Sequence, residues 1–265
     1  MKIVRFEAKG QTGYGIIEGQ TVKTISGLPW DGINLTGNEL PLASVKLLAP
    51  VHPPDVFAIG LNYKAHADES GFKYPAAPVI FLKATSSVIG PGESIILPNM
   101  APDEVDYEAE LAIVIGKTCK NVREEDALSY VLGYTCGNDV SARDCQLKQD
   151  TQWARGKSFD TFCPLGPWIE TDMDPDNAAI SLKLNGETMQ SSNTNDMIFS
   201  CSQLVSYCSR VATLKPGTVI MTGTPSGVGF SRKPPVFMKP GDTVEVIIDG
   251  IGTLSNPVSA DSLSM

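Results

Sequence analysis

Residues 105–116, with the sequence VDYEAELAIVIG, form the clearest predicted β-strand of the chain, because apolar residues dominate the run. Side chains two residues apart on a strand point to the same side, so the carboxylates of Glu108 and Glu110 project together. Two neighbouring negative charges on a half-buried face are costly unless a positive charge offsets them. The segment therefore predicts a cation site or, as the alternative, a solvent-facing strand edge on which both acids are hydrated.

The segments on either side predict a β-rich α+β fold. The 24 glycines and 19 prolines are scattered evenly, as in a protein with many turns between short strands. Further strands are predicted at residues 3–8, 14–19, 20–26, 56–60, 79–83, 94–98, 132–141, 218–223 and 243–249, with a hairpin at 180–190. Helices are predicted at residues 123–132, where acids fill the first turn, and at 195–213, where an apolar stripe contains Ile198, Cys201, Val205, Cys208 and Ala212.

The chain length and one proline-rich segment predict the domain organisation. The 265 residues are enough for one large domain with a small appendage. Residues 47–54, LLAPVHPP, indicate a connector between the two parts. We therefore place a small N-terminal β-subdomain at residues 1–50 and a catalytic domain at residues 51–265.

The composition excludes several classes of function. With 30 Asp and Glu against 21 Lys and Arg, the formal charge of −9 is unsuited to nucleic-acid binding, which needs a basic surface. Two histidines cannot build a three-His zinc site, and the six cysteines contain no C-x-x-C pair, which favours buried thiols. No apolar run is long enough to span a membrane. We expect a cytoplasmic protein, or one of the mitochondrial matrix if a transit peptide has been removed.

A third acid, Asp139, strengthens the prediction of a cation site. It ends the run GYTCGND, where a predicted strand gives way to a loop. Three carboxylates form an all-oxygen site of the kind that Mg²⁺, Mn²⁺ or Ca²⁺ prefers and zinc does not. Taken alone, Asp139 would be a turn or helix-cap residue.

His66 and Glu69 form a candidate general base. They are three residues apart, so on a helical turn they share a face and the carboxylate can orient the imidazole. The alternative is a surface helix with unrelated polar residues. The second histidine, His52, lies in the proline-rich connector, where a structural role is expected.

Cations and an amide follow Asp139 along the chain. Arg143 can bind a carboxylate in a bidentate fork, Gln146 follows it, and a desolvated Lys157 can stabilise negative charge on an oxygen. Singly, each would be an ordinary surface residue. Residues 222–229, TGTPSGVG, resemble a glycine loop whose backbone approaches a ligand closely, although no Walker A sequence is present.

Together these segments resemble the fumarylacetoacetate hydrolase family. The shared motifs are GLNY (60–63), HxxE (66–69), FLK (81–83), ExE (108–110), NDVSARD (138–144), KSFD (157–160), NGE (185–187), SSNT (191–194), MIF (197–199) and TGTPSGVG (222–229). They occur in the family's order over residues 50–258, about four fifths of the chain. The stretch RKPPVF (232–237) is most similar to the second subgroup of fumarylacetoacetate-hydrolase-domain-containing proteins.

The resemblance implies a mixed β-roll, a homodimer and an active-site Mg²⁺ or Mn²⁺. It assigns metal binding to Glu108, Glu110 and Asp139, and catalysis to His66, Glu69 and Lys157, with His66 and Glu69 on a lid. It assigns substrate contacts to Tyr63, Lys83, Arg143, Gln146 and Thr224. No catalytic position of the family pattern is missing.

The chemistry that the resemblance implies starts from a small 2-oxo acid that chelates the metal, which stabilises the enolate as a Lewis acid. Three reactions can follow from this enolate. Its reprotonation is keto–enol tautomerisation. Water activated by His66 and Glu69 can instead attack an acylpyruvate or fumarylpyruvate and cleave a C–C bond, and loss of CO₂ is the decarboxylation of oxaloacetate. The second-subgroup resemblance favours oxaloacetate tautomerisation. The alternative from another class is a module that binds metal and 2-oxo acid without catalysis.

Overall fold

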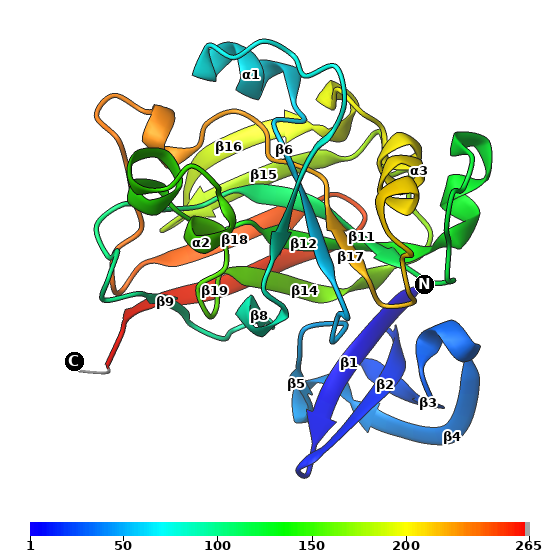
Figure 1. The fold of residues 1–265 in the computed structure, drawn as a ribbon. Coiled ribbons are helices and arrows are strands. Elements are labelled where there is room, and N and C mark those ends of the chain that lie inside the picture. Colours follow the sequence, from blue (N-terminus) through cyan, green and yellow to red (C-terminus); the bar gives the residue numbers. More distant parts are fainter. Residues whose placement is uncertain (263–265) are drawn as a thin grey trace.

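The computed structural model describes residues 1–262, which fold into a β-rich structure with few helices (Figure 1). The first strands are β1 (Lys2–Ala8), β2 (Gln11–Glu18), β3 (Thr21–Ser26), β4 (Asn34–Pro41), β5 (Lys46–Leu47), β6 (Val56–Gly60), β7 (Val79–Lys83), β8 (Val88–Ile89), β9 (Ile95–Leu97) and β10 (Val105–Asp106). The later strands are β11 (Ala109–Ile115), β12 (Val131–Asn138), β13 (Ser141–Ala142), β14 (Cys163–Glu170), β15 (Ala179–Leu184), β16 (Glu187–Asn193), β17 (Val219–Met221), β18 (Thr243–Ile248) and β19 (Gly252–Ala260). The α-helices are α1 (Lys64–Ser70), α2 (Ala154–Lys157) and α3 (Cys201–Val211).

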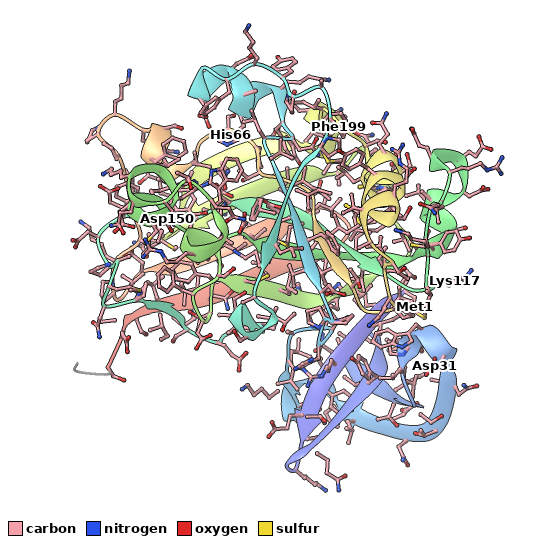
Figure 2. All side chains as sticks on the ribbon, viewed as in Figure 1. Met1, Asp31, His66, Lys117, Asp150 and Phe199 are labelled. Atoms are coloured by element: carbon pink, nitrogen blue, oxygen red, sulfur yellow. The ribbon has the colours of Figure 1, made fainter. Side chains whose placement is uncertain are left out.

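Most strands belong to one mixed sheet. Its order is β4-β3-β2-β1-β14-β12-β11-β17-β6-β7, with β5 beside β1 and β8 beside β14. The N-terminal strands join this sheet because β1 pairs antiparallel with β14. They lie at the lower right of Figure 1, and Figure 2 shows Asp31 of this part far from His66.

A second sheet, in the order β16-β15-β18-β19-β9, packs against the centre of the first. Apolar residues of the two facing layers are fully or almost fully buried, and among them are Leu111, Ile113, Ile180, Leu182 and Val246. This burial is the main stabilising contribution of the fold. It holds the central strands β11 and β12 rigidly between neighbours on both sides.

The predicted strand at residues 105–116 is interrupted in the structure. After β10 the backbone leaves the strand pairing, since the N–H of Tyr107 donates to the side chain of Asp106 (2.8 Å) and that of Glu108 donates to Asn138 Oδ1 (3.0 Å). Pairing resumes at Ala109. Glu108 therefore precedes β11 instead of lying on it, and side-chain hydrogen bonds replace the expected strand ladder.

The two predicted helices are also shorter or different. Residues 124–130 form a 3-10 helix instead of an α-helix, because only Ala127 of this segment is buried and little apolar surface supports a longer element. The predicted helix at 195–213 begins only at Cys201, after Ser200 and Gln203 form a capping box. The prediction of buried free thiols is confirmed for all six cysteines.

No helix within residues 1–262 is long and apolar enough to cross a membrane.

Candidate active site

Three buried carboxylates meet at one end of the central strands. β11 and β12 are antiparallel with Ala109 opposite Asn138, so the start of β11 lies beside the end of β12. The N–H of Asp139 donates to the carbonyl oxygen of Glu108 (2.9 Å), which fixes this corner. Ligand oxygens of Glu108, Glu110 and Asp139 lie within 4.8 Å of one another. The structure thus brings together the three predicted metal ligands.

Three buried cations surround two of these carboxylates. Lys157 Nζ lies 2.6 Å from Glu108 Oε2 and 2.7 Å from Asp139 Oδ2. Arg143 Nη2 lies 2.7 Å from Glu108 Oε1. Lys83 donates to Asp139 Oδ1 and to the carbonyl oxygen of Lys157, which ties α2 to β7. Glu108 and Asp139 are therefore charge-compensated without any bound ion.

Glu110 is different because no cation of the described chain pairs with it. Its carboxylate accepts one hydrogen bond, from the N–H of Gly223 (2.8 Å). Burial and the neighbouring charges of Asp139 and Glu108 raise the pKa of Glu110 well above its usual value. Burial alone would do the same to Glu108, but the charges of Lys157 and Arg143 hold its pKa well below the usual range.

A divalent cation fits this donor set. The site offers carboxylate oxygens only, which is the ligand type that Mg²⁺, Mn²⁺ and Ca²⁺ prefer. The uncompensated, buried carboxylate of Glu110 is the group that such an ion would stabilise most directly. A cation here would therefore offset the one carboxylate of this cluster that no described cation pairs with.

Asp106 is a buried acid that the sequence analysis did not single out. Its side chain is fully buried and pairs with Arg143, whose Nε and Nη2 lie 2.9 and 2.8 Å from Asp106 Oδ2. It also accepts from the N–H groups of Gly229 (2.8 Å) and Phe230 (3.0 Å), at the end of the glycine loop. Asp106 thus fixes both Arg143 and the glycine loop. Its position two residues before Glu108 was the available signal.

His66 and Glu69 form a hydrogen-bonded pair on α1, and His66 is the member that faces the carboxylates. His66 Nδ1 lies 2.8 Å from Glu69 Oε1. The Glu69 carboxylate also accepts from the N–H of Gly227 (3.0 and 3.1 Å), so α1 is tied to the glycine loop. A carboxylate only accepts hydrogen bonds, which places the proton of a neutral imidazole on Nδ1 and leaves a lone pair on Nε2.

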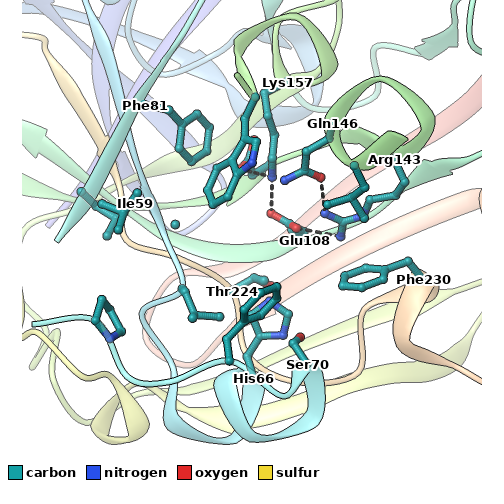
Figure 3. Close-up of a pocket in the computed structure, with 18 of the residues that line it drawn as sticks. Ile59, His66, Ser70, Phe81, Glu108, Arg143, Gln146, Lys157, Thr224 and Phe230 are labelled. Carbon is teal, nitrogen blue, oxygen red and sulfur yellow. Dashed lines mark hydrogen bonds and ion pairs between the residues drawn. The ribbon is translucent and has the colours of Figure 1, made fainter. Parts of the chain in front are cut away.

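A cavity of about 270 Å³ separates α1 from the carboxylates. Figure 3 shows His66 and Ser70 on one side and Glu108, Lys157, Gln146 and Arg143 on the other. The apolar part of the wall consists mainly of Ile59, Val79, Phe81, Leu147, Trp153 and Phe230. The cavity therefore has one charged end and aromatic or aliphatic sides, as small-molecule sites commonly do.

Of the other residues predicted to contact the substrate, two line the cavity and two do not. Gln146 and Thr224 line the cavity; Gln146 Oε1 accepts from Arg143 Nη1 (2.8 Å), and Thr224 Oγ1 accepts from Gln190 Nε2 (2.8 Å). The side chains of Tyr63 and Lys83 are buried behind it and are not among the residues that line it.

Comparisons with known proteins agree with this architecture. Residues 55–259 match the family described as fumarylacetoacetate (FAA) hydrolase, C-terminal. Residues 1–50 match the family described as Rv2993c-like, N-terminal.

Two relatives and one solved structure are among the most similar proteins. The fumarylacetoacetate hydrolase domain-containing protein 2 homolog of Dictyostelium discoideum is 49% identical over 238 residues, which cover 85% of this chain and 78% of the relative. The mitochondrial oxaloacetate tautomerase of Rattus norvegicus is 49% identical over 223 residues, covering 83% and 71%. The structure of 5-carboxymethyl-2-hydroxymuconate delta-isomerase from Mycobacterium smegmatis superposes with a TM-score of 0.90 at 46% identity, covering 98% of this chain and 100% of that one.

Proposed function

Because the chain belongs to the fumarylacetoacetate hydrolase family of enzymes, we propose that it is a metal-dependent tautomerase of small 2-oxo acids, with oxaloacetate as the leading substrate. The name of the relative from Rattus norvegicus supports the substrate, and that of the similar structure from Mycobacterium smegmatis supports the reaction class. The observation that carries the proposal is a buried set of three carboxylates that faces His66, the hydrogen-bond partner of Glu69, across one cavity.

The resident ion is proposed to be Mg²⁺ or Mn²⁺, with Ca²⁺ as a further candidate. Glu108, Glu110 and Asp139 would hold it. Bound there, such an ion supplies Lewis-acid polarisation of a keto oxygen.

His66 is proposed to move the proton. Tautomerisation of oxaloacetate transfers one proton between carbon 3 and the keto oxygen. Nε2 of His66 carries the free lone pair and accepts the proton from carbon 3, while the carboxylate of Glu69 offsets the charge of the imidazolium that forms. The imidazolium then donates this proton to the keto oxygen, which completes the enol. In the reverse direction, the same nitrogen takes the proton of the enol hydroxyl and delivers it to carbon 3.

Arg143 and Lys157 are proposed to bind and stabilise the anionic substrate. Both are buried and positively charged at the closed end of the cavity. Arg143 is held by Asp106 and Gln146, so its orientation is fixed before substrate arrives. Lys157 is held on the other side of Glu108 and is placed to stabilise negative charge on oxygen. Aromatic side chains such as Phe81 and Trp153 line the cavity and lower the local dielectric constant, which strengthens both interactions.

Hydrolytic cleavage of an acylpyruvate or fumarylpyruvate is the second proposal. The free Nε2 of His66 that faces the cavity is also placed to deprotonate a water molecule. Decarboxylation of oxaloacetate and non-catalytic binding of metal and 2-oxo acid are further alternatives.

The test is the ultraviolet decay of enol-oxaloacetate with protein, with and without Mg²⁺. A decay faster than the uncatalysed one that requires Mg²⁺ supports tautomerisation; no acceleration refutes it. Release of pyruvate from acetylpyruvate would support hydrolysis, and release of CO₂ from oxaloacetate would support decarboxylation.

Domain division, assembly and location are proposals as well. We propose that residues 1–50 form a subdomain beside a catalytic domain at 51–265, and that the protein is a homodimer, which light scattering of the purified chain would test. The relative from Rattus norvegicus is named mitochondrial. We propose the cytoplasm, with the mitochondrial matrix as the alternative, and cell fractionation distinguishes them.

A further inference from the structure

The wall of the cavity opposite the carboxylates contains one buried hydroxyl that has no partner. Ser70 is the last residue of α1, one turn after His66, and both line the cavity (Figure 3). The Oγ of Ser70 is inaccessible to solvent and makes no hydrogen bond within the described chain. Buried polar groups almost always have a partner, so an unsatisfied hydroxyl at a cavity wall indicates that a ligand supplies one.

Lys73 lies three residues further and also lines the cavity. Its side chain is exposed, and no hydrogen bond or ion pair of residues 1–262 engages its ammonium group. The other two Lys and Arg side chains of the wall, Lys157 and Arg143, are both committed to buried carboxylates. Lys73 is therefore the cation of this wall that no described carboxylate compensates, so its full charge is available to a substrate anion in addition to the partly compensated charges of Arg143 and Lys157.

The turn that follows α1 satisfies two carbonyl groups at the end of the helix. A helix end normally exposes carbonyl oxygens, whose partial negative charge repels anions. Here the carbonyl of Asp68 accepts from the N–H of Gly71 (3.2 Å) and that of Ala67 from the N–H of Phe72 (3.0 Å). Two carbonyl groups at the helix end are thus satisfied by the following turn, which reduces the negative partial charge near Ser70 and Lys73.

We propose that Ser70 and Lys73 form a second polar subsite, which binds the distal carboxylate of a 2-oxo dicarboxylate. This inference rests on the proposed function, since it assigns the keto acid end of the substrate to the three carboxylates and their ion. The subsite selects substrates with a negative charge at the far end over those that end in a methyl group. Apolar side chains such as Phe81 and Trp153 line the space between the two ends.

The test compares two stable ligands that differ only in the distal carboxylate. Malate and lactate both present a 2-hydroxy carboxylate, and only malate adds the second carboxylate. Titration calorimetry on the Mg²⁺-loaded protein gives the dissociation constant of each. We expect the wild type to bind malate more tightly than lactate, because a hydrogen bond to a charged group contributes more than one between neutral groups.

The variants assign this preference to residues. Lys73→Met should weaken malate about tenfold, Ser70→Ala about threefold to tenfold, and neither should change lactate binding. Lys73→Arg keeps the charge and should retain most of the preference. Lys64→Met removes an exposed lysine of α1 that does not line the cavity, and it should change neither affinity.

Two results would contradict the proposed subsite. One is a wild type that binds malate no more tightly than lactate. The other is a Lys73→Met variant whose affinities for malate and lactate fall by the same factor. The reaction is judged separately. A protein that discriminates malate through Lys73 but does not accelerate enol-oxaloacetate decay keeps the subsite and loses the proposed tautomerisation.

Discussion

Replacing a buried acid of the proposed metal site should stabilise the metal-free protein. The carboxylate of Glu110 has no cation partner among the described residues and lies within 4.8 Å of the ligand oxygens of Glu108 and Asp139. Two unit charges at this separation repel by about 3 kcal/mol at an effective dielectric constant of about 20. The charge of Lys157 offsets part of this repulsion. Glu110→Gln removes the charge and keeps an oxygen for the N–H of Gly223.

The effect of this substitution depends on pH. The pKa of Glu110 is raised in the folded protein, so above the unfolded pKa of about 4.3 the folded state retains a proton that the unfolded state releases. The free energy of unfolding of the wild type therefore falls as pH rises, until pH reaches the folded pKa. The free energy of unfolding of Glu110→Gln does not fall in this way, because the glutamine side chain does not titrate. The two proteins should be equally stable near pH 4, and at pH 8 the variant should be more stable by about 1–3 kcal/mol.

The assay is urea unfolding in EDTA from pH 4 to 8, followed by thermal unfolding. For a chain of this size, a gain of 1–3 kcal/mol raises Tm by about 2–10 °C. Glu7→Gln, which removes an exposed carboxylate, is the matched control and should change the stability by less than about 0.5 kcal/mol. A Glu110→Gln variant that is less stable than the wild type at pH 8, or a difference that does not grow with pH, would refute the reasoning.

Three further substitutions separate chemistry from structure. His66→Ala should lower kcat about 10²–10⁴-fold and leave Mg²⁺-induced thermal stabilisation intact; unchanged kcat contradicts its role as the base. Glu69→Ala should lower kcat and, by freeing Gly227, speed amide hydrogen exchange in the loop that it holds; unchanged exchange contradicts the tie between α1 and that loop. Asp106→Ala should cost about 3–5 kcal/mol in urea unfolding because Arg143 loses a buried partner; a loss under 1 kcal/mol contradicts this pairing.

Local pattern was sufficient to predict much of the fold. Alternating or continuous apolar runs located β1, β6, β7, β12 and β18, because such strands bury side chains at regular positions. The break at Tyr107 was not predictable, since it depends on side-chain hydrogen bonds to Asp106 and to Asn138, which is 30 residues away from Glu108. Helix boundaries were also missed where tertiary burial, not periodicity, decides how long a helix persists.

The sequence predicted those site residues whose side-chain type and spacing suit only a few kinds of chemistry. The pairs Glu108 with Glu110 and His66 with Glu69 lie close in the sequence, so their spacing alone predicted their proximity. Asp106 was missed because its one signal, a position two residues before Glu108, carries little weight in an acidic chain. Its importance follows from complete burial and from Arg143, which only the folded chain brings to it.

If the proposed site tautomerises a 2-oxo acid with a metal held by Glu108, Glu110 and Asp139, its reaction rate must depend on that metal. The most direct test is the initial rate of enol-oxaloacetate decay as a function of Mg²⁺ concentration, for the wild type and Glu110→Gln side by side. We expect a saturable increase of the rate for the wild type and little or none for the variant. Equal rates in both proteins at every Mg²⁺ concentration would contradict this expectation.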